Sequence, residues 1–315
     1  MPGDQGKVSR YRILVCLDGS DEGYRGLRYA AKLSGGVEAY VTVLHLRSPD
    51  STLPEGLEDL SPEADMFQWG RKAPGVIYLD NARKLLEELG VMRADWHVRF
   101  GHEARDDDPL GNNKAVYEQD GVPRVTFRND VAANIADGIL AEVDAHKIDL
   151  VILGASDRWR KAVIKTFWDP AVAEKVAKNA PCSVLVAREL AIGHGHLICV
   201  DGSEKALEMV RKDAELASRC KCPVSLISVA MDEDGLHRAK AHVEQAKAVI
   251  EGMGIPVLRT VADVGEPVHE IIEAGPDYSL IVLSASSASG LARFFIGGTA
   301  FKVMEEAYNS VLIVR

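Results

Sequence analysis

The sequence predicts an α/β fold in which two units, each built on a parallel sheet, follow one another in tandem. Apolar runs typical of buried parallel strands alternate with segments of helical spacing throughout the chain. An apolar run, an Asp-Gly-Ser turn and a helix occur at 11–33 and again at 196–207. The apolar runs 181–188 and 309–315 are also alike. These repeats indicate a tandem duplication, with one unit at 1–190 and the other at 196–315.

The first unit begins with a strand at 11–17, which ends in Asp18-Gly19-Ser20. A helix follows, because Ser20 or Asp21 can cap it and apolar residues recur at helical spacing up to Gly35-Gly36. A second strand is predicted at 39–46. Strand, helix and strand with short connections predict a parallel sheet with right-handed crossovers.

Two insertions near 47–75 and 101–124 make the first unit longer than the second. The first combines four prolines with Met66, Phe67 and Trp69, and is predicted to be an ordered covering loop that also adds apolar surface. The second contains the acidic run Asp106–Asp108, predicted to be a solvated loop rather than a cation site, and a turn at 120–121. Amphipathic helices are expected at 80–89 and 131–143, before a buried strand at 148–153.

The second unit is compact. A helix is predicted at 237–252, a strand at 257–261, and a helix after Gly265-Glu266-Pro267, where the proline sits in the first turn. A buried strand at 280–283 runs into the small-residue loop 284–290, and a helix opens at 297–299 before the closing strand. Small residues followed by a helix start predict an anion site, because backbone N–H groups can approach a phosphate there.

This loop resembles the nucleotide loop of the universal stress protein family. The family spacing of Gly, two residues, Gly, nine residues, Gly and then Ser or Thr falls on Ser284, Ser287, Gly297 and Gly298, so serine replaces both early glycines. Serine is small and its hydroxyl can donate to a phosphate, but it resists the positive φ that glycine adopts freely.

The resemblance implies two Rossmann-like domains of the flavodoxin-like, adenine nucleotide α-hydrolase-like kind, and ATP with Mg²⁺ as a candidate companion ion. It assigns the phosphates to the loop and the helix start, and the adenosine to Asp201 and Val229 at the ends of two strands. The loop of the first unit keeps Gly154 but otherwise carries bulk and charge, so one ATP per chain is expected. The predicted binding residues are Asp201, Gly202, Ser203, Val229, Ser284, Ser287, Gly297, Gly298 and Thr299.

Two hypotheses for function remain open. In one, the chain senses stress by binding an adenine nucleotide. In the other, it is a structural or interaction module that has lost binding, and Asp18 and Asp201 only cap helices or form turns. No Gly-x-Ser-x-Gly, His-Glu-x-x-His or Walker lysine motif is present, so an activity beyond weak ATP hydrolysis is not expected.

The charge and hydropathy of the chain exclude some classes of binding partner. A net charge of -10 without a basic stripe argues against nucleic acid and anionic membranes as partners. No apolar run is long enough for a membrane span, and the polar start lacks a signal-peptide core, so a cytoplasmic location is expected. The protein partner and the type of stress are left open.

The cysteines and histidines do not predict a metal or catalytic site. Of five cysteines, Cys16, Cys182 and Cys199 lie in apolar runs, whereas Cys220-Lys-Cys222 stands apart. A metal or redox role for that pair needs further ligands, and no histidine lies at zinc spacing nearby. His194 and His196 are assigned to the interdomain linker.

The closing strands of the two units are apolar throughout, and an uncovered apolar edge favours strand pairing. Single-unit members of the resembled family dimerise through this strand. We therefore predict that strands 183–186 and 310–314 pair edge to edge about a pseudo-twofold axis. The chain would then be an internally paired monomer or a homodimer of such chains.

Overall fold

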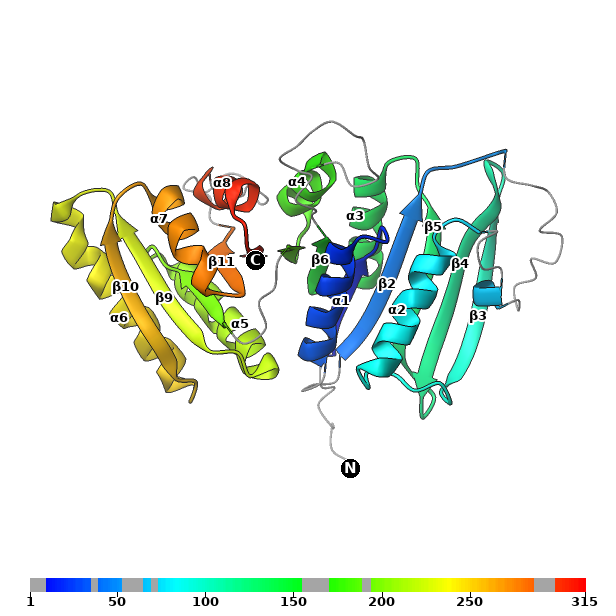
Figure 1. Ribbon diagram of the computed structural model, residues 1–315, viewed down its shortest axis with the longest axis horizontal. Coiled ribbons are helices and arrows are strands. Elements are labelled where there is room, and N and C mark those ends of the chain that lie inside the picture. Colours follow the sequence, from blue (N-terminus) through cyan, green and yellow to red (C-terminus); the bar gives the residue numbers. More distant parts are fainter. Residues whose placement is uncertain are drawn as a thin grey trace, which may run out of the picture.

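The computed structural model describes residues 10–34, 39–52, 65–68, 73–154, 170–188, 194–285 and 298–315. Their strands form one 12-stranded sheet in the order β10-β9-β8-β11-β12-β7-β6-β1-β2-β5-β4-β3, with helices on both faces (Figure 1). Both units are α/β, as predicted.

The elements of the first unit are β1 (Tyr11–Cys16), α1 (Asp21–Ser34), β2 (Ala39–Arg47), α2 (Val76–Glu88), β3 (His97–Arg105), β4 (Asp108–Gln119), β5 (Val122–Val131), α3 (Ile135–His146), β6 (Leu150–Gly154), α4 (Pro170–Asn179) and β7 (Ser183–Ala187). Those of the second are β8 (His196–Cys199), α5 (Glu204–Cys220), β9 (Val224–Ala230), α6 (Leu236–Gly252), β10 (Val257–Val264), α7 (Pro267–Ala274), β11 (Leu280–Ser284), α8 (Gly298–Glu306) and β12 (Ser310–Val314).

The second insertion is a β-hairpin rather than a loop. β3 and β4 pair antiparallel and extend the sheet beyond β5, which is the third parallel strand of the first unit. The predicted turn at Asp120-Gly121 joins β4 to β5, and both residues have positive φ. Because β5 runs to Val131, α3 begins only at Ile135, after the side chain of Asn134 accepts a hydrogen bond from the Asp137 backbone.

The prediction that Asp106–Asp108 form a solvated loop is wrong for Asp108. Asp106 and Asp107 are exposed at the hairpin turn, but Asp108 is buried and paired with the guanidinium of Arg47, whose Nη2 lies 2.6 Å from Oδ1. Backbone N–H groups of Leu110 and Gly111 also donate to this carboxylate. Burial raises the pKa of Asp108, but the Arg47 bond and the backbone donors outweigh it and hold that pKa below its usual range.

The first insertion covers the first unit, as predicted, where it is described. Met66 is buried in the core, and the ring of Phe67 packs edge-on against Phe127 of β5. Asn129 near the end of β5 donates to the carbonyl of Pro74. Met66 therefore adds no apolar surface for association, contrary to expectation, and Trp69 lies outside the described residues.

The two units join by antiparallel pairing of β7 with β12, so the predicted edge pairing is confirmed. Leu185 faces Leu312, and the register is symmetric about this pair, as an approximate twofold axis requires.

The pairing of β7 with β12 forms the seam between the units. Hydrogen bonds at the two ends of this seam obey the same symmetry. The backbone N–H of Arg188 donates to the Ser310 hydroxyl, and that of Arg315 donates to the Ser183 hydroxyl. Each arginine side chain also donates to carbonyls at the end of the other unit's last helix: Arg188 to α8 and Arg315 to α4. A cation favours the negative end of a helix dipole, so these contacts stabilise the seam.

Two apolar cores run along the sheet. On one face the sheet packs against α1, α2, α5 and α6, and on the other against α3, α4, α7 and α8. Each core includes residues of both units, so burial of apolar surface holds the units together. Within the described part of the chain, no helix has the length and apolar character needed to span a membrane.

His196 is not part of a linker, contrary to expectation. It is the first residue of β8 and is fully buried between α5 and α1. Its Nδ1 lies 3.1 Å from a carboxylate oxygen of Asp213, and its Nε2 lies 3.0 Å from the hydroxyl of Tyr29 in the first unit. His194, just before the strand, is exposed.

Candidate functional site

The predicted binding residues of the second unit gather where the strand order reverses. The chain runs from β8 outward to β9 and β10, and then returns to the other side of β8 with β11 and β12. Open parallel sheets bind ligands beyond the carboxyl ends of their strands at such a switch point. Ser284, Asp201 and Val229 lie two or three residues beyond the level of Ile198, which pairs with both neighbouring strands. Adjacent strands lie about 4.8 Å apart, so these three backbones span about 10 Å.

The Asp201-Gly202-Ser203 turn follows β8. Asp201 is exposed and its Oδ1 accepts a hydrogen bond of 3.0 Å from the Ser203 backbone. The Ser203 hydroxyl then caps α5 by accepting from the backbone of Ala206 at 3.1 Å. The Asp201 carboxylate therefore forms the turn and still faces solvent with its second oxygen.

His242 of α6 was not among the predicted site residues, although it packs directly against this turn. Gly202 has a φ of 77°, and a Cβ on it would lie 2.2 Å from the imidazole ring of His242. The same ring lies 3.4 Å from the Ser228 hydroxyl on β9. The sequence shows His242 only as one residue of a predicted helix, and the fold brings it to the carboxyl ends of β8 and β9.

The phosphate side of the predicted site is described in part. Ser284 is the half-buried last residue of β11, and Gly298 and Thr299 are exposed in the first turn of α8. Ser287 and Gly297 lie outside the described residues, as does the corresponding loop of the first unit at 155–169.

The corresponding region of the first unit is filled by side chains. Asp18 accepts hydrogen bonds from the backbone and hydroxyl of Ser20, so it forms the expected turn. A Cβ on Gly19 would overlap the Tyr78 ring, and one on Gly75 would overlap the His45 ring. His45 occupies the position of the smaller Ser228 in the second unit.

Burial and hydrogen bonding fix the state of His45. Its Nδ1 lies 2.7 Å from the carbonyl of Leu17, to which it donates, and its ring meets Tyr78 edge-on. Burial lowers the pKa of His45, so the ring stays neutral at physiological pH. The insertion, His45 and Tyr78 together cover the ends of β1, β2 and β5.

Solved structures with similar folds include proteins that match over nearly the whole of both chains. A protein of unknown function from Pseudomonas aeruginosa matches with 17% identity over 97% of this chain and 92% of that one, at a TM-score of 0.60. A universal stress protein from Archaeoglobus fulgidus matches with 15% identity over 96% and 98%, at a TM-score of 0.61. At these identities the likeness shows the fold alone. A shorter universal stress protein from Archaeoglobus fulgidus, in complex with dAMP, has 21% identity over 38% of this chain and 97% of that one, at a TM-score of 0.33.

No curated protein matches the chain at a significant level. A model of the universal stress protein family, in contrast, matches twice, at residues 10–188 and 196–315. These two matches cover nearly the whole sequence and coincide with the two α/β units of the fold. The chain therefore belongs to the universal stress protein family.

Proposed function

We propose that this chain is a cytoplasmic stress sensor that binds one ATP in its second unit and is not an enzyme. One structural difference between the two units supports ATP binding in the second unit only. β9 and α6 are joined by a short turn at 231–235, so no insertion follows β9 within the described residues 194–285. In the first unit, the segment that ends at Gly75 covers the equivalent strand ends and packs against His45.

The proposed contacts follow the resemblance to the family. Asp201 and Val229 hold the adenosine, and Gly202 and Ser203 complete the turn beside it. Ser284, Ser287, Gly297, Gly298 and Thr299 hold the phosphates, with Mg²⁺ as the counter-ion. The exposed first turn of α8 supports this assignment, because the N–H groups of a first helical turn have no partner within the helix and the positive end of the helix dipole favours an anion.

Gly298→Asp is expected to abolish ATP binding without unfolding the chain. A Cβ at this position meets open space, and the backbone is outside the left-handed region. A carboxylate in the first turn of a helix is compatible with the helix dipole, so the fold should be kept. The carboxylate would repel a bound phosphate. Calorimetric titration with ATP measures the loss, and circular dichroism checks the fold.

Gly252→Asp is the matched control. Gly252 ends α6 at the opposite, amino-terminal edge of the sheet, and a Cβ there also meets open space. This variant should bind ATP like the wild type. Unchanged binding in Gly298→Asp, or equal loss in both variants, would contradict the proposed phosphate site.

A further inference from the structure

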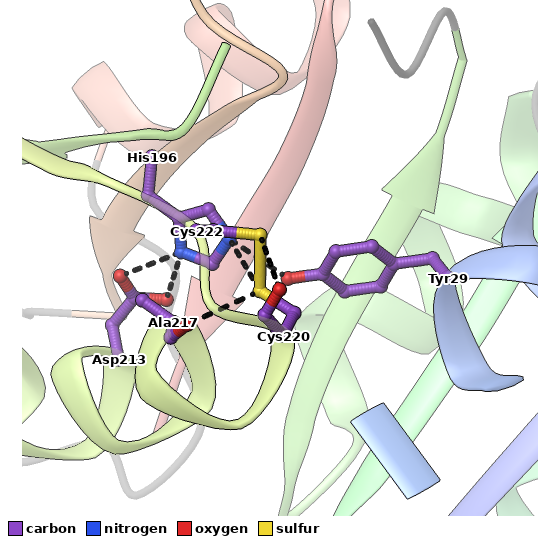
Figure 2. Close-up of a disulfide and its surroundings, with 6 residues drawn as sticks. All are labelled: Tyr29, His196, Asp213, Ala217, Cys220 and Cys222. Carbon is purple, nitrogen blue, oxygen red and sulfur yellow. Dashed lines mark hydrogen bonds and ion pairs between the residues drawn. A yellow bond between two sulfur atoms is a disulfide. The ribbon is translucent and has the colours of Figure 1, made fainter. Parts of the chain in front are cut away.

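Three metal-ligating side chains of the second unit meet next to the junction of the two units (Figure 2). The ligand atoms of His196, Cys220 and Cys222 all lie within 4.8 Å of one another. His196 is fully buried and Cys220 is only 9% exposed, whereas Cys222 is half-buried. The two cysteines form a disulfide in this structure. No histidine stands at zinc spacing near this pair in the sequence, but the fold supplies one, because β8 brings His196 to it from 24 residues away.

The end of α5 places the two sulfur atoms together. Lys221 has a φ of 53°, and its N–H bonds to the carbonyl of Ser218. The N–H of Cys222 bonds back to Ala217 at 2.9 Å. This pair of bonds is a Schellman motif, which reverses the chain after the helix. The reversal turns the side chains of Cys220 and Cys222 toward each other and toward β8, as Figure 2 shows.

Asp213 orients the imidazole. Its two carboxylate oxygens lie 3.1 and 3.2 Å from Nδ1 of His196, so Nδ1 carries the proton and donates to them. Nε2 then presents a lone pair, 3.9 Å from the sulfur of Cys220 and 3.0 Å from the hydroxyl of Tyr29. A histidine that donates through one nitrogen to a carboxylate and offers the other to a metal is the usual arrangement at protein zinc sites.

The internal repeat shows that the fold does not need this polar pair. By the alignment of Asp18 with Asp201, His196 corresponds to Ile13 and Asp213 to Ala30, both fully buried apolar residues in the first unit. Replacing a buried ionisable pair with apolar residues is often neutral or stabilising. Stability alone therefore does not account for a buried His-Asp pair beside two cysteines in the second unit.

We propose that reduced Cys220 and Cys222, together with His196, bind a zinc ion, and that the disulfide is the metal-free state of the same site. Two molecules of a low-molecular-weight thiol reduce the disulfide, giving two cysteine thiols and one small-molecule disulfide. Zn²⁺ then displaces two thiol protons and forms two Zn–S bonds and one Zn–N bond to Nε2. Water completes the tetrahedron on the half-exposed side of Cys222.

Zinc binding at this site affects the contact between units. The hydroxyl of Tyr29, on α1 of the first unit, donates to Nε2 of His196 in the disulfide state. A metal on Nε2 takes the lone pair that this hydrogen bond uses. Reduction and zinc loading therefore exchange an interaction between the units for a metal site within the second unit.

The test uses the full chain. One sample is reduced with a phosphine that is then removed without oxygen, and a second sample is left oxidised. Zn²⁺ is titrated in competition with a chromophoric chelator. The reduced chain should bind one zinc and release two protons, measured by calorimetry in buffers of different ionisation enthalpy, and the oxidised chain should bind none.

Serine variants make the test specific. Cys220→Ser and Cys222→Ser should each weaken zinc binding by at least about tenfold, since loss of a ligand costs no less than loss of an outer partner. Co²⁺ should give thiolate charge-transfer absorption in the reduced wild type but not in the double variant, in which both Cys220 and Cys222 are replaced by serine. Cys199→Ala, which removes the thiol three residues after His196, is the control and should match the wild type. Zinc binding that is equal in the reduced wild type and the double variant, or absent from both, would overturn the proposal.

Discussion

Asp108→Ala is expected to lower the free energy of unfolding by about 3–5 kcal/mol, because it leaves the guanidinium of Arg47 buried without a counter-charge. Both side chains are almost inaccessible to water, with exposed fractions of 4% for Arg47 and 0% for Asp108. The variant also removes the acceptor of three backbone N–H groups, those of Asp50, Leu110 and Gly111. Urea denaturation followed by circular dichroism measures the change.

Asp107→Ala is the control, because it removes a neighbouring carboxylate whose ion pair with Arg105 is exposed. Exposed pairs contribute little, so its effect should stay below about 1 kcal/mol. The Asp108 effect should also depend on pH. Because the folded-state pKa of Asp108 is lowered, its stabilisation is complete above the unfolded value of about 4 and is lost as the pH falls through the folded value. Equal losses in the two variants at neutral pH would refute the role of the buried pair.

Leu312→Pro is expected to separate the two units. β12 pairs with β11 on one side and β7 on the other, so a proline there removes a donor that lies in a ladder and fixes φ in a central strand. Loss of one buried hydrogen bond costs about 1–3 kcal/mol, and the buried Leu312 side chain is lost as well. The expected results are a lower melting temperature and a larger radius of gyration, or aggregation.

Leu258→Pro provides the comparison. Leu258 is 72% exposed on the edge strand β10, at an irregularity in its pairing with β9. Proline is tolerated at such positions, so this variant should keep the wild-type scattering radius. A wild-type radius and melting temperature in Leu312→Pro would rule out the seam as the element that joins the units.

The repeated units and their pairing could be predicted from the sequence because local patterns encode them. The closing strands 183–187 and 310–314 are apolar at nearly every position. This pattern indicates that both faces of the sheet are covered there and that the strand edge pairs with another strand. The Asp-Gly-Ser turns likewise identified the ends of β1 and β8. Because parallel strands share one carboxyl edge, the sequence also placed Asp201, Val229 and Ser284 at the same edge of the sheet.

Contacts between distant residues could not be predicted in this way. Arg47 and Asp108 are 61 residues apart, and nothing in the acidic run distinguishes Asp108 from its exposed neighbours. His196 was assigned to the interdomain linker because it lies next to the predicted boundary between the units. A comparison of the repeats would have found it, since Ile13 occupies the same position in the first unit.

The stoichiometry of ATP binding tests the central claim most directly. The claim is that the second unit alone is competent, because an insertion and His45 cover the equivalent strand ends of the first, whereas the second unit has the smaller Ser228 in place of His45. Calorimetric titration of the purified, nucleotide-free chain should give one ATP per chain. A stoichiometry near two would contradict the asymmetry, and the absence of any heat or thermal shift at millimolar ATP would contradict nucleotide sensing and favour an interaction module.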